Sequence, residues 1–231
     1  MTAVLEIDNL RKSYAGLRPL RVKRLTLAPG DRVAVAGLDA AAAELLVNLV
    51  TGATLPDEGR IRTFGRDTAD ITSGDDWLAS LDRFGIVSDR AVLLEGSTLA
   101  QNLAMPFTLE IDPVAPAMLA RVTALAQECG IAGEWLMQAA GAVPSEIRAR
   151  AHLARAVAME PQLLVLEHPT ASVAGPDRLP LAQDVVRVCE RRRLAALVIT
   201  LDEPFAKAVA SRVLTLNGAT GELREKKKGW W

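Results

Sequence analysis

The chain has 231 residues, of which 50% are hydrophobic and 24% are charged, and its formal net charge is −1. This length and apolar fraction are sufficient for one domain with a substantial core, whereas the near-neutral charge gives no electrostatic reason to expect nucleic acid as a partner. The sequence contains neither a signal-peptide pattern nor a run of ~18 apolar residues, so we expect a cytoplasmic protein.

The first part of the chain predicts strands followed by a glycine and a helix. Residues 4–10 alternate between apolar and polar side chains, as a half-buried strand does, and residues 25–27 predict a further short strand. Arg32–Ala36 predicts a buried strand that ends at Gly37, and Ala40–Val50 predicts a helix with one apolar face. A buried strand followed by a loop and a helix is the unit that carries phosphate-binding loops.

The remainder of the chain alternates between helices and strands. Residues of about 90–150 are expected to form a helical subdomain, with helices at 98–105, 113–129 and 134–140. The other expected elements are strands at 60–62, 84–87, 163–167, 195–200 and 212–216 and helices at 148–159, 180–191 and 205–211. This alternation predicts a mostly parallel α/β sheet.

Residues 224–231 mix lysine with tryptophan; we expect them to form a flexible tail, with contact to a membrane surface as the alternative.

One strand ends in a pattern that resembles a known family. The strand ending at Glu167 continues as Glu167-His168-Pro169-Thr170 and follows a helix that contains Ala154-Arg155-Ala156. This arrangement resembles the core of an ABC-transporter ATPase domain, and the likeness extends over roughly residues 5–223. It implies a single domain over residues 1–231 with a P-loop NTPase-like core, a mostly parallel sheet, N-terminal antiparallel strands and a helical subdomain.

The phosphate loop of the family aligns with Gly37-Leu38-Asp39-Ala40-Ala41-Ala42-Ala43-Glu44. Such a loop needs glycines so that backbone N–H groups can turn toward the phosphates, a lysine for the β/γ oxygens, and a hydroxyl for magnesium. Here Ala40 and Ala42 replace glycines, Ala43 replaces the lysine and Glu44 replaces the hydroxyl residue. A glutamate beside a phosphate is repulsive, by ~4 kcal/mol per charge pair at ~4 Å with an effective dielectric constant of about 20. The plain alternative is an ordinary helix start that is capped by Asp39.

The positions that sense nucleotide also depart from the family. Asp89 stands where the family has the glutamine that senses the γ-phosphate, and its plain alternative is a solvated loop acid. Pro144, Ser145 and Glu146 stand in the signature motif, which offers N–H groups to the ATP of a partner subunit. Pro144 removes one donor and Glu146 adds a negative charge, so the segment also fits an ordinary helix start.

The catalytic positions of the family fall on unusual residues. Glu167 stands at the magnesium-binding aspartate and could still ligate a cation, while His168 replaces the carboxylate that activates water. A lone histidine can act as a general base, but a structural role is the alternative. Leu201 replaces the switch histidine and cannot polarise a substrate. Tyr14, the only tyrosine, matches the aromatic residue that stacks on adenine, with packing alone as the alternative.

These departures predict an ATP-binding-protein-like subunit that does not hydrolyse ATP and has a structural or regulatory role in a transporter complex. We expect no metal site and no tightly bound cofactor, and ATP and magnesium stay as candidates only.

The resemblance implies a homo- or heterodimer with another ABC ATPase domain, a membrane-spanning transporter subunit as a further partner, and a location at the inner face of the membrane. Four apolar residues in the helical subdomain, Leu99, Leu103, Met105 and Phe107, favour such a docking face, although they fit a core equally well.

Two other functions stay open. An atypical but active ATPase would need Lys12, Lys23 or a nearby arginine to replace the missing lysine, and His168 to replace the carboxylate. A soluble binding module that reuses the fold would differ by having no transporter partner.

The two cysteines, Cys129 and Cys189, are expected to be buried, reduced and without a catalytic role.

Overall fold

The computed structural model describes residues 2–88 and 90–225, and the structural statements below refer to those residues. The strands are β1 (Leu5–Lys12), β2 (Leu20–Leu27), β3 (Arg32–Ala36), β4 (Glu58–Thr63), β5 (Arg66–Asp67), β6 (Phe84–Val87), β7 (Leu163–Glu167), β8 (Ala195–Ile199), β9 (Arg212–Leu216) and β10 (Leu223–Glu225). The helices are α1 (Ala40–Val50), α2 (Gly74–Leu81), α3 (Leu99–Ala104), α4 (Pro116–Glu128), α5 (Ser145–Val157), α6 (Gly175–Arg192) and α7 (Glu203–Val209), with short 3-10 turns η1 (Thr68–Asp70) and η2 (Gly133–Trp135).

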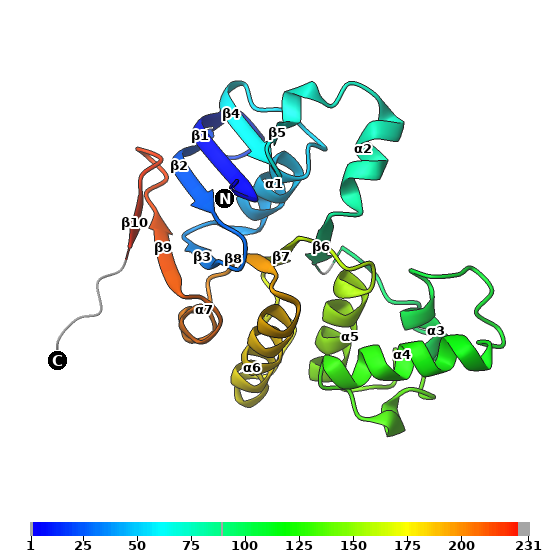
Figure 1. The fold of residues 1–231 in the computed structure, drawn as a ribbon. Coiled ribbons are helices and arrows are strands. Elements are labelled where there is room, and N and C mark those ends of the chain that lie inside the picture. Colours follow the sequence, from blue (N-terminus) through cyan, green and yellow to red (C-terminus); the bar gives the residue numbers. More distant parts are fainter. Residues whose placement is uncertain (1, 89, 226–231) are drawn as a thin grey trace.

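The strands form two sheets, which confirms the expected α/β class. The larger sheet has the order β10-β9-β3-β8-β7-β6, and its strands run parallel except for β10, which is antiparallel to β9. The smaller sheet has the order β2-β1-β4-β5 and is antiparallel throughout. Figure 1 shows the smaller sheet above the larger one, with α5 and α6 on the opposite side of the larger sheet.

The two faces of the larger sheet contribute to two separate cores. Along β7, Leu163 and Val165 belong to the core that also contains α1 and the smaller sheet. Leu164 and Leu166, which alternate with them, belong to the core formed with the later helices. This period-2 alternation is why strands buried on both faces read as continuous apolar runs in the sequence.

The region of residues 90–150 contains α3, α4, η2 and the start of α5, which lie together at one side of the molecule in Figure 1. Leu99 and Leu103, which were candidates for a docking face, are fully buried. Phe107 is partly buried and carries the guanidinium of Arg121 over its ring at 3.7 Å. The core alternative therefore holds for these residues.

Several elements differ from the sequence-based expectation. The helix expected at 134–140 is only the 3-10 turn η2, and α2 was not expected. Helix α6 begins at Gly175, five residues before the expected start at Pro180, which lies inside the helix. The first-turn proline of α6 is Pro176, a position that favours proline because its missing N–H would be unpaired there in any case. Of the expected C-terminal tail, residues 224 and 225 belong to β10 and residues 226–231 lie outside the described part.

Candidate functional site

The carboxyl ends of β3, β8 and β7 meet at one edge of the larger sheet. The N–H of Thr200 donates to the carbonyl of Val35 at 3.2 Å, and the N–H of His168 donates to the carbonyl of Ile199 at 2.8 Å. Such an edge is where ligands bind in open α/β sheets. Three of the predicted segments, the phosphate loop, the end of β7 and the loop at Leu201, are therefore neighbours.

The phosphate-loop segment forms a helix start that uses its own carboxylate as the cap. Gly37 has φ +93, a left-handed conformation that favours glycine, and α1 begins at Ala40 without interruption. The Asp39 carboxylate accepts a hydrogen bond from the N–H of Ala42 at 2.8 Å, and the Asp39 carbonyl accepts from the N–H of Ala43 at 2.8 Å. An anion thus already lies at the helix N-terminus, where a phosphate would otherwise find free donors.

The side chains of the phosphate-loop helix offer no cation to a ligand. Ala42 and Ala43 are buried, with Ala43 at 0% exposure, and Glu44 is half exposed. The position that the resemblance assigns to a lysine is therefore a methyl group inside the core. These observations agree with an ordinary helix start capped by Asp39.

Arg90 links the phosphate-loop helix to the end of β7. Its guanidinium donates to Glu44 Oε1 at 3.0 Å and to Glu167 Oε2 at 2.7 Å. Glu167 is almost covered, with a side-chain exposure of 10%, so the contact gives a nearly buried carboxylate a charged partner. The resemblance assigns magnesium-binding positions to these two acids, and the cation observed between them is Arg90 of the chain itself.

Sequence reasoning missed Arg90. It is 46 residues from Glu44 and 77 from Glu167, and no local pattern distinguishes it from other loop arginines. Its neighbour Asp89, the position of the glutamine sensor, lies outside the described residues.

His168 adopts a left-handed backbone conformation, with φ +43, directly after β7. Its carbonyl accepts from the N–H of Ala171 at 2.9 Å, which forms a turn. Its Nε2 is buried and has no hydrogen-bond partner within the described residues. No carboxylate orients this imidazole, so the arrangement that makes a histidine an effective general base is missing from the described part.

The loop after β8 presents a leucine to solvent and an acid to the protein. Leu201 is 65% exposed. The Asp202 carboxylate accepts from the N–H of Phe205 at 3.0 Å and thereby caps α7. It also accepts from the Thr170 hydroxyl and from Arg178 Nη1, each at 3.1 Å. Asp202 therefore attaches this loop to the segment after β7 and to α6.

Tyr14 lies near the phosphate-loop segment but is packed by its own chain. Burial raises the pKa of Tyr14, and the nearby Asp39 carboxylate raises it further. Gly16 lies so close to the phenol ring that an added Cβ would be 2.4 Å from Tyr14 Cζ. The ring is partly buried against the core of the smaller sheet. Gly16 and the core of the smaller sheet therefore already contact the ring that the resemblance assigns to adenine stacking.

The signature segment lies in the helical region. Pro144 is the N-cap residue of α5 and provides no side-chain cap, and its carbonyl accepts from the N–H groups of Ile147 and Arg148, each at 3.1 Å. Within the described residues, Pro144, Ser145 and Glu146 make no hydrogen bond or ion pair with the phosphate loop. The segment forms the start of α5, as both interpretations of Pro144, Ser145 and Glu146 expect.

The lysines that an active enzyme would need are engaged elsewhere. Lys12 Nζ pairs with Asp57 at 2.9 Å, and Lys23 Nζ pairs with Glu222 at 2.9 Å. The Asp57 pKa is lowered to about 2, first by the Lys12 side-chain hydrogen bond. Neither lysine contacts the phosphate loop within the described part.

Comparisons with known proteins agree on one family. A family profile for the ABC transporter matches residues 20–171. The chain is 27% identical over 216 residues to the sulfate/thiosulfate import ATP-binding protein CysA of Thermosynechococcus vestitus, covering 92% of this chain and 61% of that protein. It is 29% identical over 221 residues to the lipoprotein-releasing system ATP-binding protein LolD of Pseudomonas syringae pv. tomato, covering 94% of this chain and 96% of that protein. The chain thus spans 61% of the length of the first relative and nearly all of the second.

Two solved structures share the fold. The ATP-binding cassette MJ0796, a dimer in a post-hydrolysis state bound to ADP and Pi, matches with a TM-score of 0.77 and 19% identity, covering 98% of this chain and 100% of that chain. The cbiO1 protein from Clostridium perfringens, part of the ABC transporter complex cbiONQ, matches with a TM-score of 0.80 and 18% identity, covering 97% of this chain and 88% of that chain. At these identities the likeness establishes the fold alone.

Proposed function

This chain belongs to the ABC transporter family, and we propose from that premise that it is an ATP-binding-protein-like subunit that does not hydrolyse ATP. The proposal gives it a structural or regulatory role in a transporter complex. The observation that carries it is the occupation of the phosphate and cation positions by the chain's own charges, Asp39 at the start of α1 and Arg90 between Glu44 and Glu167.

The chemistry of phosphoryl transfer explains why this occupation matters. Catalysis by such domains depends on cationic groups and magnesium that neutralise the charge developing on the γ-phosphate. Near the phosphate-loop helix, Asp39 and Glu44 add negative charge. The Nη1 and Nη2 atoms of Arg90 each donate a hydrogen bond to a carboxylate of the chain. Arg90 is the nearby arginine that an active alternative would require, and using it for ATP would leave Glu167 without its partner.

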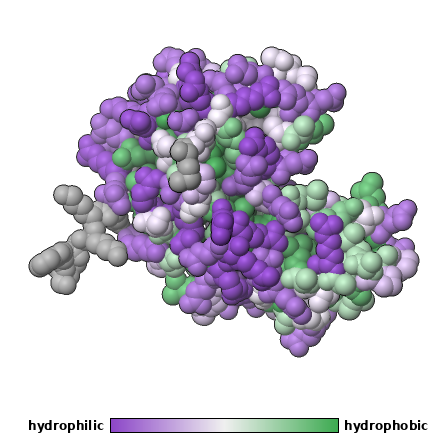
Figure 2. Space-filling model, viewed as in Figure 1, coloured by the Kyte–Doolittle hydropathy of each residue, from purple (hydrophilic) through white to green (hydrophobic). Residues whose placement is uncertain are grey.

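The proposed partners are another ABC ATPase domain and a membrane-spanning subunit, at the inner face of the membrane. None of the described helices has the length and hydropathy needed to cross a bilayer. In the proposed complex a separate subunit spans the membrane. Exposed apolar side chains in the helical region support a docking face there: Val92, Leu94, Leu109 and Met137. In Figure 2, apolar surface gathers over this side of the molecule, whereas the smaller sheet is mostly polar.

Calorimetric titration of the purified chain with Mg-ATP, with ADP and adenosine in parallel, tests the proposal. At the phosphate loop we expect a dissociation constant above ~1 mM for ATP, or equal affinity for ATP and adenosine, because the cation described there, Arg90, is already paired with Glu44 and Glu167. Binding of ATP well below ~1 mM and much tighter than adenosine would contradict it. Affinity purification from the native cell, with detection of a membrane-spanning subunit, separates the transporter role from a free-standing binding module.

Replacing Arg90 by glutamine gives a second prediction at this site. Without the guanidinium, Glu44 and Glu167 lack their cation, and we expect millimolar Mg²⁺ or Mn²⁺ to raise the melting temperature of Arg90→Gln by about 2–5 °C while leaving the parent unchanged. The double variant Arg90→Gln/Glu44→Gln is the control, because it removes one of the two acids and should lose the response. An equal response of the parent and Arg90→Gln would show that the guanidinium does not hold a cation position.

A further inference from the structure

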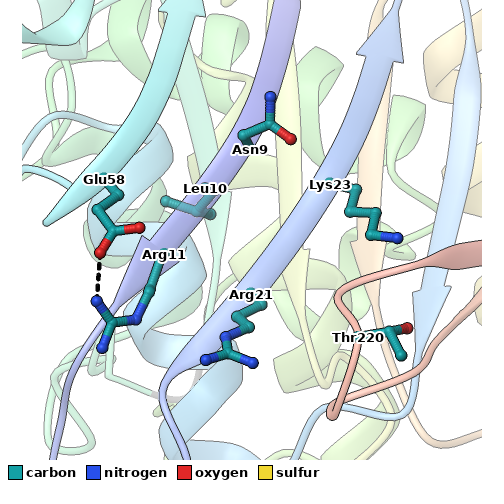
Figure 3. A pocket seen from close by; sticks show the side chains of 7 residues that line it. All are labelled: Asn9, Leu10, Arg11, Arg21, Lys23, Glu58 and Thr220. Atoms are coloured by element: carbon teal, nitrogen blue, oxygen red, sulfur yellow. Dashed lines mark hydrogen bonds and ion pairs between the residues drawn. The ribbon is translucent and has the colours of Figure 1, made fainter.

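A second polar site lies on the outer face of the smaller sheet. A cavity of about 390 Å³ is lined by Asn9, Leu10, Arg11, Arg21, Lys23, Glu58 and Thr220. Figure 3 shows Arg11 and Arg21 on neighbouring strands with their guanidinium groups at the same end of the cavity, and Thr220 on the loop at its far side. None of these residues belongs to the phosphate loop or to the ends of β7 and β8.

Strand register places two like charges opposite each other. Arg11 on β1 pairs with Arg21 on β2 on one side and with Glu58 on β4 on the other, so the three residues form one row across the sheet. Like charges directly opposite each other are destabilising. The carboxylate of this row, Glu58, forms an ion pair with Arg11 on the side away from Arg21. It therefore does not lie between the two guanidinium groups.

The hydrogen bonds leave donors in excess. Arg21 donates through Nη1 to the carbonyl of Ala219 at 3.2 Å and has no carboxylate partner within the described residues. The carboxamide of Asn9 makes no hydrogen bond there. Lys23 pairs with Glu222, which also pairs with Arg224 at 2.8 Å and is therefore shared between two cations. The lining thus contains three cations against the single carboxylate of Glu58.

The backbone around the cavity is fixed by close contacts. The register of β1 shifts between Asp8 and Arg11, where Asn9 has φ +49. A β-bulge of this kind redirects side chains. On the other side, the N–H of Lys23 donates to the carbonyl of Gly221 at 2.7 Å, and a Cβ on Gly221 would lie 2.9 Å from Arg21 Cβ. The loop before β10 is thereby held against β2, so the cavity wall is set before any ligand binds.

We propose that this cavity binds a phosphate-type dianion, with Arg11 and Arg21 as its cationic donors and Asn9 and Thr220 as neutral ones. Guanidinium groups bind phosphate oxygens in pairs through two parallel N–H donors, and a dianion between the two arginines would offset their mutual repulsion. The ligand is a phosphomonoester group or free phosphate, whose source is either the solution or a lipid headgroup. The site is independent of the phosphate loop and of whether the chain binds ATP.

Titration with inorganic phosphate, measured by calorimetry, tests the site through variants with opposite effects. Arg21→Gln should weaken binding by about tenfold or more, because it removes a charged donor. Glu58→Gln should tighten it, because it removes the competing carboxylate. Arg24→Gln is the matched control, since Arg24 is exposed on the same strand but does not line the cavity.

Sedimentation with phosphatidylcholine vesicles containing phosphatidic acid, against vesicles containing phosphatidylglycerol, distinguishes the source of the group. Preference for phosphatidic acid that Arg21→Gln abolishes and Arg24→Gln does not would assign the site to a lipid headgroup. Saturable binding of inorganic phosphate with the same variant pattern would assign it to a soluble ligand. Absence of binding in both experiments, or equal losses in Arg21→Gln and Arg24→Gln, would overturn the proposal.

Discussion

Replacing Asp184 by alanine is expected to lower the free energy of unfolding by about 3–5 kcal/mol, because it leaves a nearly buried arginine without its partner. Asp184 on α6 accepts from Arg150 Nε on α5 at 2.6 Å, and the two side chains are only 10% and 11% exposed. The same carboxylate accepts from Arg187 at 2.6 Å. It also lies beside Gly130 at the end of α4, where an added Cβ would be 2.7 Å from Asp184 Oδ2. Asp184 therefore joins α4, α5 and α6.

Urea unfolding of Asp184→Ala measures this loss. Arg187→Gln is the matched control, because Arg187 contacts the same acid but is 51% exposed, and its removal should cost less than about 1 kcal/mol. Similar losses in the two variants would mean that burial does not decide the contribution of this ion pair.

Alkaline pH is expected to destabilise the protein through its two buried thiols. Burial raises the pKa of Cys129 and of Cys189 from 9.0 to about 12. The folded state therefore keeps protons that the unfolded state releases, so the contribution to stability is complete below pH 9.0 and is lost as the pH rises toward about 12. Each thiol should lower the free energy of unfolding by about 1.4 kcal/mol per pH unit within that window.

Unfolding curves recorded at several pH values above 9.0 check this slope. Cys189→Ala is expected to lower stability at neutral pH by removing buried volume, and to make the alkaline slope shallower by about 1.4 kcal/mol per pH unit. A lower stability with an unchanged slope would show that the thiol acts through packing alone.

The sequence predicted the framework well where buried runs are bounded by glycine or by a cap. The bounds of β3, α1, β6 and β9 match the expectation, because apolar strands and a one-faced helix have distinct periods. Helix α2 was missed because it is only eight residues long, which is too short for its apolar pattern to distinguish a helix from a loop. The expected helix at 134–140 failed because Ala139 and Ala140 follow a single 3-10 turn into a loop, where Ala139 forms an isolated bridge with Thr98.

The site was predictable only in part, for a geometric reason. The Asp39 cap follows from residue type and position, and the positions of Glu44 and Glu167 follow from the framework on either side of them. The guanidinium between those two acids comes from a third segment, and its role depends on how β6 and β7 lie next to each other. The cavity at Arg11 and Arg21 likewise required the strand register of the smaller sheet, which a single sequence does not specify.

The charges of Asp39 and Arg90 beside the phosphate-loop helix affect how the stability of the protein responds to ATP in the cell. A domain that binds ATP at 100 times its dissociation constant gains about 2.7 kcal/mol of stability by mass action, and loses it when ATP is depleted. Here Asp39 and Arg90 provide the anion and the cation from within the chain, so the proposed function implies no such gain. The folded fraction, and with it the supply of this subunit for assembly, would then be the same in starved and in well-fed cells.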